Sequence, residues 1–194
     1  MKRIYLAVVF GAVAAMAFAP VAGASQPSTL EVNGGYAKSS DDATGNGDKL
    51  SGGLSFGGAY WRSASPTVSW GAELSYDSMG NIKYDNGITT NNEASAHILR
   101  INPALRFNFG RGVGPNFYAQ VGAGFYNVTA KLDDSFFGNL QNTDAKFGFN
   151  GGAGITMPVG EKARLNFNGL YHNVTMNPNN LNYLQFRVGV GLGI

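Results

Sequence analysis

Seven charged residues each lie between two apolar neighbours, and they are the strongest candidates for chemistry in this sequence. In a β-strand, where successive side chains point to opposite faces, this spacing places each charge on the face opposite its apolar neighbours. Carboxylates and bases gathered on one enclosed face either pair with one another or, where bases are in excess, line a path for anions. The seven residues are Glu31, Glu73, Arg100, Arg106, Lys146, Arg164 and Arg187.

The two histidines, His97 and His172, are the other residues that could do chemistry. A nucleophilic site needs a base, a nucleophile and an orienting acid within hydrogen-bond reach, and the residue order around neither histidine supports such a triad. The alternation also places His172 opposite the apolar face, away from any lipid substrate. Two separated histidines and no cysteine do not suggest a metal site. We therefore expect no enzymatic activity, no cofactor and no metal.

The last twelve residues show most clearly which element positions these charges. In Y-L-Q-F-R-V-G-V-G-L-G-I, residues 183–194, every second residue is apolar, and Arg187 and the glycines occupy the other positions. A strand with one continuous apolar face and a polar or bare opposite face is typical of a membrane barrel, where the apolar side meets lipid. A soluble ligand-binding barrel would instead turn its large apolar residues inward and its charges outward.

The same alternation recurs along the chain and predicts an all-β fold, an eight-stranded antiparallel up-and-down transmembrane β-barrel. The glycine-rich, aromatic-rich composition agrees with many short strands. Pro103 falls on the lipid-facing side, where we expect it to mark a bulge. The expected strands are residues 30–37, 50–60, 68–76, 99–109, 117–126, 146–157, 164–172 and 183–194.

The connections between these strands alternate in length. Short ones are expected at 63–67, 110–115 and 159–162, and longer ones at 39–49, 78–95, 132–143 and 173–181, with Asp85 to Gly87 as a hairpin tip. Bacterial outer-membrane barrels have short periplasmic turns and longer external loops. The pattern therefore predicts that both chain ends lie in the periplasm and the longer connections outside the cell.

The N-terminus has the features of a secretory signal peptide. Lys2 and Arg3 precede an apolar run, and Ala22 and Ala24 form a small-residue cleavage site. An uncleaved membrane helix is the rival interpretation, but the run is short and interrupted by Pro20. We expect residues 1–24 to be a cleaved signal peptide and residues 25–194 to form one outer-membrane β-barrel domain.

The charge balance excludes a general attraction to nucleic acid. Without Lys2 and Arg3, 12 of the 14 basic residues remain, and they equal the 12 acidic residues. A neutral chain without a basic patch does not favour nucleic-acid binding.

The chain resembles the small eight-stranded outer-membrane β-barrels that include the OmpA transmembrane domain and OmpX, also known as the porin family. The resemblance rests on the strand pattern, the turn asymmetry and a C-terminal assembly signal at Arg187, Gly189, Leu192 and Ile194, although Ile194 stands where the family usually has an aromatic residue. It implies a surface antigen in the outer membrane of a Gram-negative bacterium. Its implied partners are outer-membrane lipid, lipopolysaccharide and the outer-membrane assembly machinery.

The function expected from these observations is structural or surface-interacting, with the lumen plugged by an ion network. A narrow porin-like channel for small solutes is the alternative, and a lipid A-modifying enzyme is disfavoured. The inward glycines either make room for large side chains or leave a cavity. The external loops, with acidic residues such as Asp41 and Asp133 and the apolar pair Phe136–Phe137, could bind a host or extracellular ligand.

Overall fold

The computed structural model describes residues 27–40, 50–84, 92–110, 114–134, 138–176 and 180–194. The expected signal peptide, the hairpin tip Asp85 to Gly87 and the Phe136–Phe137 pair lie outside the described residues. Within the described part, no helix is long and apolar enough to cross a membrane.

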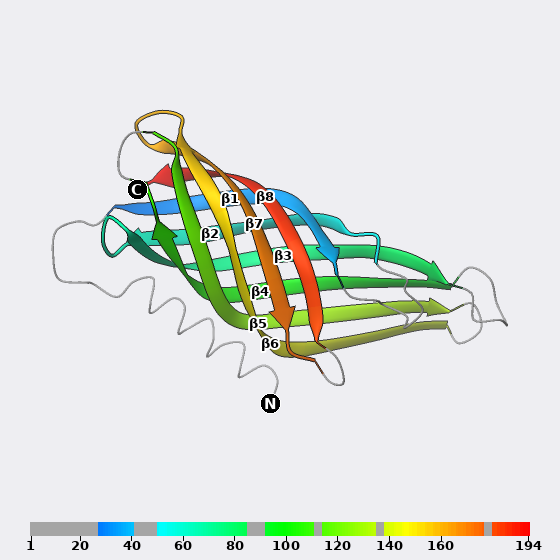
Figure 1. Cartoon of the computed structure of the whole chain (residues 1–194). Helices are drawn as coiled ribbons and strands as arrows, with labels where there is room; N and C mark the ends of the chain where they lie inside the picture. Colours follow the sequence, from blue (N-terminus) through cyan, green and yellow to red (C-terminus); the bar gives the residue numbers. More distant parts are fainter. Residues whose placement is uncertain (1–26, 41–49, 85–91, 111–113, 135–137, 177–179) are drawn as a thin grey trace.

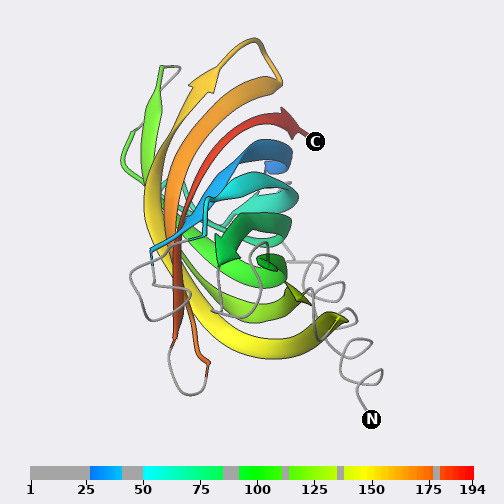
Figure 2. The same ribbon diagram turned by 90° about the vertical axis from the view of Figure 1, so that its right-hand side faces the viewer.

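Eight antiparallel strands form a closed barrel in which each strand pairs with its neighbours in sequence and β1 pairs with β8 (Figures 1 and 2). This confirms the predicted fold class. The strands are β1 (Ser28–Ser39), β2 (Gly53–Ser63), β3 (Val68–Tyr84), β4 (Asn92–Asn108), β5 (Asn116–Asp134), β6 (Gly138–Pro158), β7 (Ala163–Val174) and β8 (Leu181–Gly193).

The alternation of apolar and polar residues sets which side chains face outward. Along β1, Leu30 and Val32 are 50% and 66% exposed, whereas Glu31 and Asn33 between them are buried. Along β8, Phe186, Val188 and Val190 are exposed and Arg187 is buried. An apolar surface of this kind is favourable against lipid. The outer surface of the barrel is therefore that of a membrane protein, with its apolar side chains facing the hydrocarbon.

Strands β3 to β6 are longer than predicted and project beyond the barrel (Figure 1). The expected loops at 78–95 and 132–143 are wrong in this respect, because β3 continues to Tyr84, β4 begins at Asn92, β5 ends at Asp134 and β6 begins at Gly138. The outer face of this projecting sheet carries Lys83, Glu93, Lys131, Asp133 and Gln141 in place of apolar residues. The apolar alternation that identifies a lipid-facing strand is therefore missing there.

The asymmetry between the two ends of the barrel thus lies in the strands more than in the loops. We call the end with residues 64–67 and 159–162 the turn end, and the end where β3 to β6 project the hairpin end. Only residues 135–137 separate β5 from β6 at the hairpin end, whereas residues 109–115 separate β4 from β5 at the turn end.

The bulge predicted at Pro103 is absent from the pairing of β4 with β3 and with β5. The β4–β5 pairs on either side of it, Ile101↔Phe125 and Ala104↔Gly122, keep one register. The irregularity lies instead in β3, between Ser78 and Asn81, where Gly80 has a φ of 72°. A positive φ is readily adopted by glycine, so this residue permits the kink at the level where β3 leaves the barrel.

Inside the hairpin end, the lumen is filled by an apolar plug. Leu50, the first residue of the strand expected at 50–60, belongs to it and is 7% exposed, because β2 begins only at Gly53. The apolar plug consists of Ala37, Leu50, Met79, Ile98, Tyr126, Val128, Val174 and Tyr183. A charged network fills the middle of the lumen, next to this plug.

Candidate functional site

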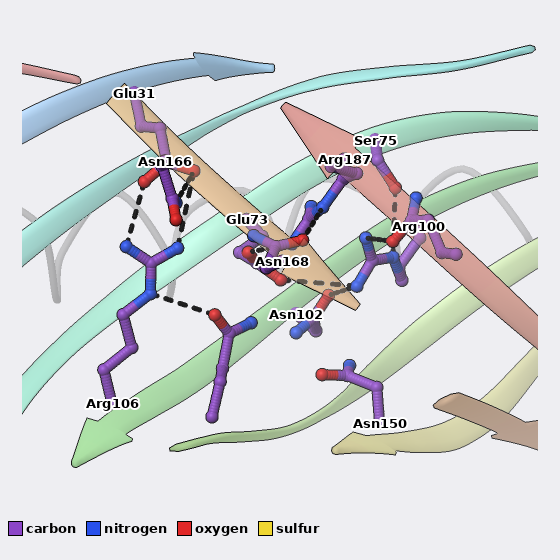
Figure 3. Close-up of polar contacts among 12 residues, drawn as sticks. Glu31, Glu73, Ser75, Arg100, Asn102, Arg106, Asn150, Asn166, Asn168 and Arg187 are labelled. Carbon is purple, nitrogen blue, oxygen red and sulfur yellow. Dashed lines mark hydrogen bonds and ion pairs between the residues drawn. The ribbon is translucent and has the colours of Figure 1, made fainter. Parts of the chain in front are cut away.

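Glu73 of β3 is the central carboxylate of the lumen (Figure 3). Its Oε1 accepts a hydrogen bond from Nη2 of Arg187 at 3.0 Å, and its Oε2 accepts one from Nη1 of Arg100 at 3.3 Å. All three side chains are at most 1% exposed. Because ions away from bulk water are costly unless paired, this arrangement binds β3, β4 and β8 together through charge.

A second ion pair lies closer to the turn end and joins β4 to β1. Both terminal nitrogens of Arg106 donate to the carboxylate of Glu31, at 2.9 and 3.4 Å, and its Nε donates to Gln120 at 2.9 Å. The guanidinium also lies 3.8 Å from the ring centroid of Trp61 and 4.5 Å from that of Tyr118. Charge, hydrogen bonds and cation–π contacts therefore hold Arg106 in one orientation.

Asn side chains connect the two ion pairs. Asn166 donates to Glu31 at 2.8 Å and accepts from the hydroxyl of Tyr118 at 2.7 Å. Asn168 donates to the Tyr118 hydroxyl at 3.1 Å and accepts from Nε of Arg187 at 3.0 Å. Through the Tyr118 hydroxyl, the two charged pairs thus form one continuous polar network across the lumen. Figure 3 shows the two groups that Tyr118 connects.

Asp77 is a third buried carboxylate, and the sequence reasoning missed it. It accepts hydrogen bonds from Ser55, Tyr183 and Gln185 at 2.6, 3.1 and 2.5 Å, and it lies 4.0 Å from Nε of Arg100. Asp77 lies four residues after Glu73 in β3, so its side chain faces the same side of the strand. This spacing is the signal that could have identified it.

His172 is buried among polar and aromatic groups at the border of the apolar plug. Its ring stacks on Tyr183 with centroids 4.3 Å apart, and its two nitrogens lie 3.1 Å from the Tyr126 hydroxyl and 3.1 Å from the Gln185 amide oxygen. His97 instead lies on the outer side, where its ring stacks on Tyr76 at 5.7 Å. The two histidines are thus on opposite sides of the barrel wall.

Two of the seven charged candidates do not join the network. Lys146 is partly exposed and pairs with Asp144 at 3.5 Å near the hairpin end. Arg164 is exposed near the turn end, because β7 begins only one residue before it. When these two bases are left out and Asp77 is included, the buried charges among the described residues are three carboxylates and three arginines. The excess of bases expected inside the lumen is therefore not found there.

The inward glycines make room for aromatic rings at two levels of the lumen. A Cβ atom on Gly148 would lie 2.9 Å from the Tyr126 ring, and one on Gly154 would lie 2.5 Å from the Tyr118 ring. Of the two roles considered from sequence, space for large side chains applies at these positions. A cavity is present elsewhere, at the turn end, where an open pocket of about 470 Å³ lies next to Glu31 and Arg106.

The sequence matches one family model over residues 5–193, described as outer membrane protein beta-barrel domain. The chain belongs to this outer membrane β-barrel family. No curated protein sequence matches it. The outward apolar faces and the closed eight-stranded sheet are what membership implies.

Solved structures of other members of this architecture show the same fold at low sequence identity. Neisserial surface protein A is 12% identical, with a TM-score of 0.56 over 85% of this chain and 96% of that chain. Ail, the attachment invasion locus protein of Yersinia pestis, in complex with the heparin analogue sucrose octasulfate, is 14% identical, with a TM-score of 0.58 over 87% and 99%. The N-terminal barrel domain of Pseudomonas aeruginosa OprF is 16% identical, with a TM-score of 0.54 over 86% and 97%.

Proposed function

We propose that this outer membrane β-barrel is a non-enzymatic, non-conducting protein that interacts with ligands outside the cell through its projecting sheet. The observation that carries the proposal is the pairing of buried charges inside the lumen. Glu73 contacts both Arg100 and Arg187, and Glu31 contacts Arg106 through both carboxylate oxygens. These groups fill the interior that a solute would have to cross.

The electrostatics of the lumen argue against the alternative of a narrow anion channel. Three carboxylates and three arginines balance among its buried residues, so the middle of the barrel offers no net positive charge. The apolar plug adds a second barrier, because moving an ion past Met79, Ile98 and Val128 would strip its hydration shell. Eight strands leave an interior just wide enough for side chains, which these residues occupy.

Single-channel recording in a planar bilayer tests closure of the lumen. We expect no steady openings from refolded protein whose folded state is verified by heat-modifiable gel mobility. An Arg106→Glu variant serves as comparison. Steady openings of the unmodified protein, with an ion preference that shifts in this variant, would show a basic pore and contradict the proposal.

The projecting sheet supports the interaction part of the proposal. In the orientation proposed from sequence, the turn end faces the periplasm and the hairpin end lies outside the cell. The outer face of the projecting sheet is polar, but its inner face carries a cross-strand apolar row in which Ile82 pairs with Ala94, Ala94 with Leu132, and Leu132 with Leu140. Leu140 is 57% exposed. Exposed apolar side chains beyond the lipid-facing region are suited to contact with another molecule.

Binding assays on cells or matrix can locate the contact surface. The double variant Leu132→Ser with Leu140→Ser removes the exposed end of the apolar row and should lower binding. The matched control, Lys131→Ser with Gln141→Ser, changes the neighbouring cross-strand pair on the outer face and should leave binding unchanged. Equal binding by both variants would place the contact elsewhere.

The chemistry of the ligand differs from that of a heparin-like polyanion. Ail was solved with the heparin analogue sucrose octasulfate. In this chain the outer face of the projecting sheet carries two described bases, Lys83 and Lys131, and two described acids, Glu93 and Asp133, with Glu93 paired across the strands with both Lys83 and Asp133. The balance favours an apolar contact over recognition of dense negative charge.

Export and assembly follow from the same proposal. Residues 1–24 would direct export, and the C-terminal strand would be recognised by the outer-membrane assembly machinery before the barrel meets lipid and lipopolysaccharide. Leu192 and Ile194 are 51% and 74% exposed, so their side chains are available on the outer surface, whereas Arg187 is engaged inside with Glu73.

A further inference from the structure

The turn end of the barrel contains a blind cavity that the proposed surface function does not use. Its volume is about 470 Å³, and its mouth is bordered by the turn residues Ala64 and Pro66. We call this cavity the cup. Its floor is formed by Glu31, Arg106 and Asn166, beyond which the polar network closes the lumen. Cavities of this size in the mouths of β-barrels are common places for small ligands.

The floor of the cup has little capacity left for a ligand. Arg106 donates through Nε to Gln120 and through both terminal nitrogens to Glu31. The carboxylate of Glu31 additionally accepts from Asn166. The charges of the floor therefore neutralise each other, and recognition must come from the walls.

The walls of the cup present hydrogen-bond donors without partners. Within the part of the chain that the structure describes, Arg164 has no ion pair or hydrogen bond, and the hydroxyls of Thr29 and Thr156 have no hydrogen bond, yet all three residues line the cup. Arg164 lies opposite Gly191 on β8, so no side chain from that position occupies the space beside it.

The amide of Asn116 is oriented so that its donor remains available. Its Oδ1 accepts a hydrogen bond from the backbone N–H of Gly110 at 2.7 Å, and its Nδ2, which borders the cup, has no partner among the described residues. Asn116 pairs across the strands with Thr156, and Thr156 with Asn166 of the floor, so Asn116 and Thr156 form one wall next to the floor. One unpaired cation beside several hydroxyl and amide groups matches a ligand that carries one oxyanion and several hydroxyls.

We propose that the cup binds a small polyhydroxylated anion, a sugar acid or a sugar phosphate, whose oxyanion contacts Arg164 and whose hydroxyls contact Thr29, Thr156 and Asn116. The floor pair Glu31–Arg106 stops the ligand from passing further, so the cup holds a solute without conducting it. In the orientation proposed above, the ligand reaches the cup from the periplasm.

Titration calorimetry of the refolded full chain in lipid nanodiscs tests this site. The probes are glucuronate and glucose 6-phosphate, with glucose as the uncharged counterpart that has the same ring. We expect at least one of the anions to bind about tenfold or more tightly than glucose, because charge-assisted hydrogen bonds exceed neutral ones by this margin. The stronger of the two anions identifies carboxylate or phosphate as the preferred group.

Variants assign the binding to Arg164. Arg164→Gln should weaken binding of the preferred anion about tenfold or more, since it removes the charged contact, and Arg164→Lys should retain binding. The control Lys162→Gln removes the same charge from an exposed residue two positions away that does not line the cup, and should leave the affinity unchanged. Folding of each variant is checked by heat-modifiable mobility.

Three results would overturn the proposal. They are no heat of binding with either anion, equal affinity for glucose and the anions, and equal affinity of the Arg164→Gln and Lys162→Gln variants. None of these results depends on whether the projecting sheet binds a ligand, so failure of the cup and failure of the proposed surface function are distinguishable.

Discussion

Glu73 and Arg187 are 114 positions apart in sequence, and their side chains meet at 3.0 Å inside the barrel. Glu73 belongs to β3 and Arg187 to the last strand, so the contact requires most of the chain to be in place. The same carboxylate also holds Arg100. One side chain therefore pairs with two buried cations.

Removing the charge of Glu73 should be strongly destabilising. A Glu73→Gln variant leaves Arg100 and Arg187 without their shared carboxylate, and breaking a buried ion pair by removing one partner costs about 3–5 kcal/mol. Urea unfolding in lipid, followed by tryptophan fluorescence, measures the effect. Glu161→Gln, on an exposed turn residue, is the control and should have little effect. An unchanged midpoint for Glu73→Gln would count against the network.

The glycine in the β3 irregularity should not tolerate a side chain. Gly80 has a φ of 72°, and a Cβ atom there would overlap the carbonyl oxygen of Gly52. We expect Gly80→Ala to lower the free energy of unfolding by about 1–3 kcal/mol. Gly34→Ala is the matched control, since a Cβ atom there would lie 3.8 Å from its nearest neighbour, the carbonyl oxygen of Ser55. Equal stability of the two variants would refute this account of the kink.

The same substitution at the two histidines should have opposite effects. The Nδ1 atom of His97 is buried without a hydrogen-bond partner among the described residues, and its ring stacks on Tyr76. His97→Phe keeps the stack and removes the unpaired atom, so we expect a gain of about 1 kcal/mol.

His172→Phe, in contrast, removes hydrogen bonds to Tyr126 and Gln185 and leaves those buried groups unpaired, at a cost of about 1–3 kcal/mol. Thermal unfolding in detergent compares the two variants directly. A shift of the same sign in both would show that burial of the polar ring atoms does not decide their stability.

Cysteine labelling can determine which end of the barrel faces the outside. The chain has no cysteine, so Gln141→Cys on the projecting sheet and Ser65→Cys at the turn end each provide one reactive thiol at an exposed position. A membrane-impermeant maleimide should label Gln141→Cys on intact cells and Ser65→Cys only after the outer membrane is permeabilised. The reverse pattern would invert the proposed orientation.

The membrane-embedded part of the fold could be predicted from sequence because lipid imposes a strict alternation on it. Leu30 and Val32 face outward and Glu31 lies between them on the inner face, as the period of two requires. The same rule identified Glu73, Arg100, Arg106 and Arg187 as residues of one face without information about their partners.

The projecting sheet could not be predicted by that rule because water replaces lipid at its outer face. Lys83, Lys131 and Gln141 occupy positions that would be apolar inside the membrane, so the segment resembles a loop in sequence although it is paired in structure. The inner row from Ile82 to Leu140 contributes only one apolar residue from each strand, so it gives no period along the sequence. In β4, β5 and β6 these residues have the opposite parity to the lipid-facing residues, whereas Ile82 shares the parity of Leu74 and Tyr76 because the register shifts between Ser78 and Asn81.

Part of the candidate site could not be predicted from the alternation of side chains, because it depends on where each residue lies along the barrel axis. Lys146 and Arg164 have the parity of the lumen residues, but they lie near the ends of the barrel, where water is available to them. Asp77 and Gln185 come together although they are 108 positions apart. Parity specifies the face of a strand, whereas the shear of the closed sheet decides which residues share a level.

Seen from the hairpin end, the unequal strand lengths give the barrel a tall side and a low side. About twelve residues in β1, β2, β7 and β8, tilted by roughly 45°, span roughly 28 Å, close to the thickness of a bilayer core. The roughly ten residues of β6 that precede its first pair with β7 rise on the order of 20 Å further. The barrel wall is therefore tall at β3 to β6 and low at β1 and β8. Among the described residues, no strand of the low side extends to the level of the inner apolar row, so a partner of the projecting sheet would approach this row across the low side.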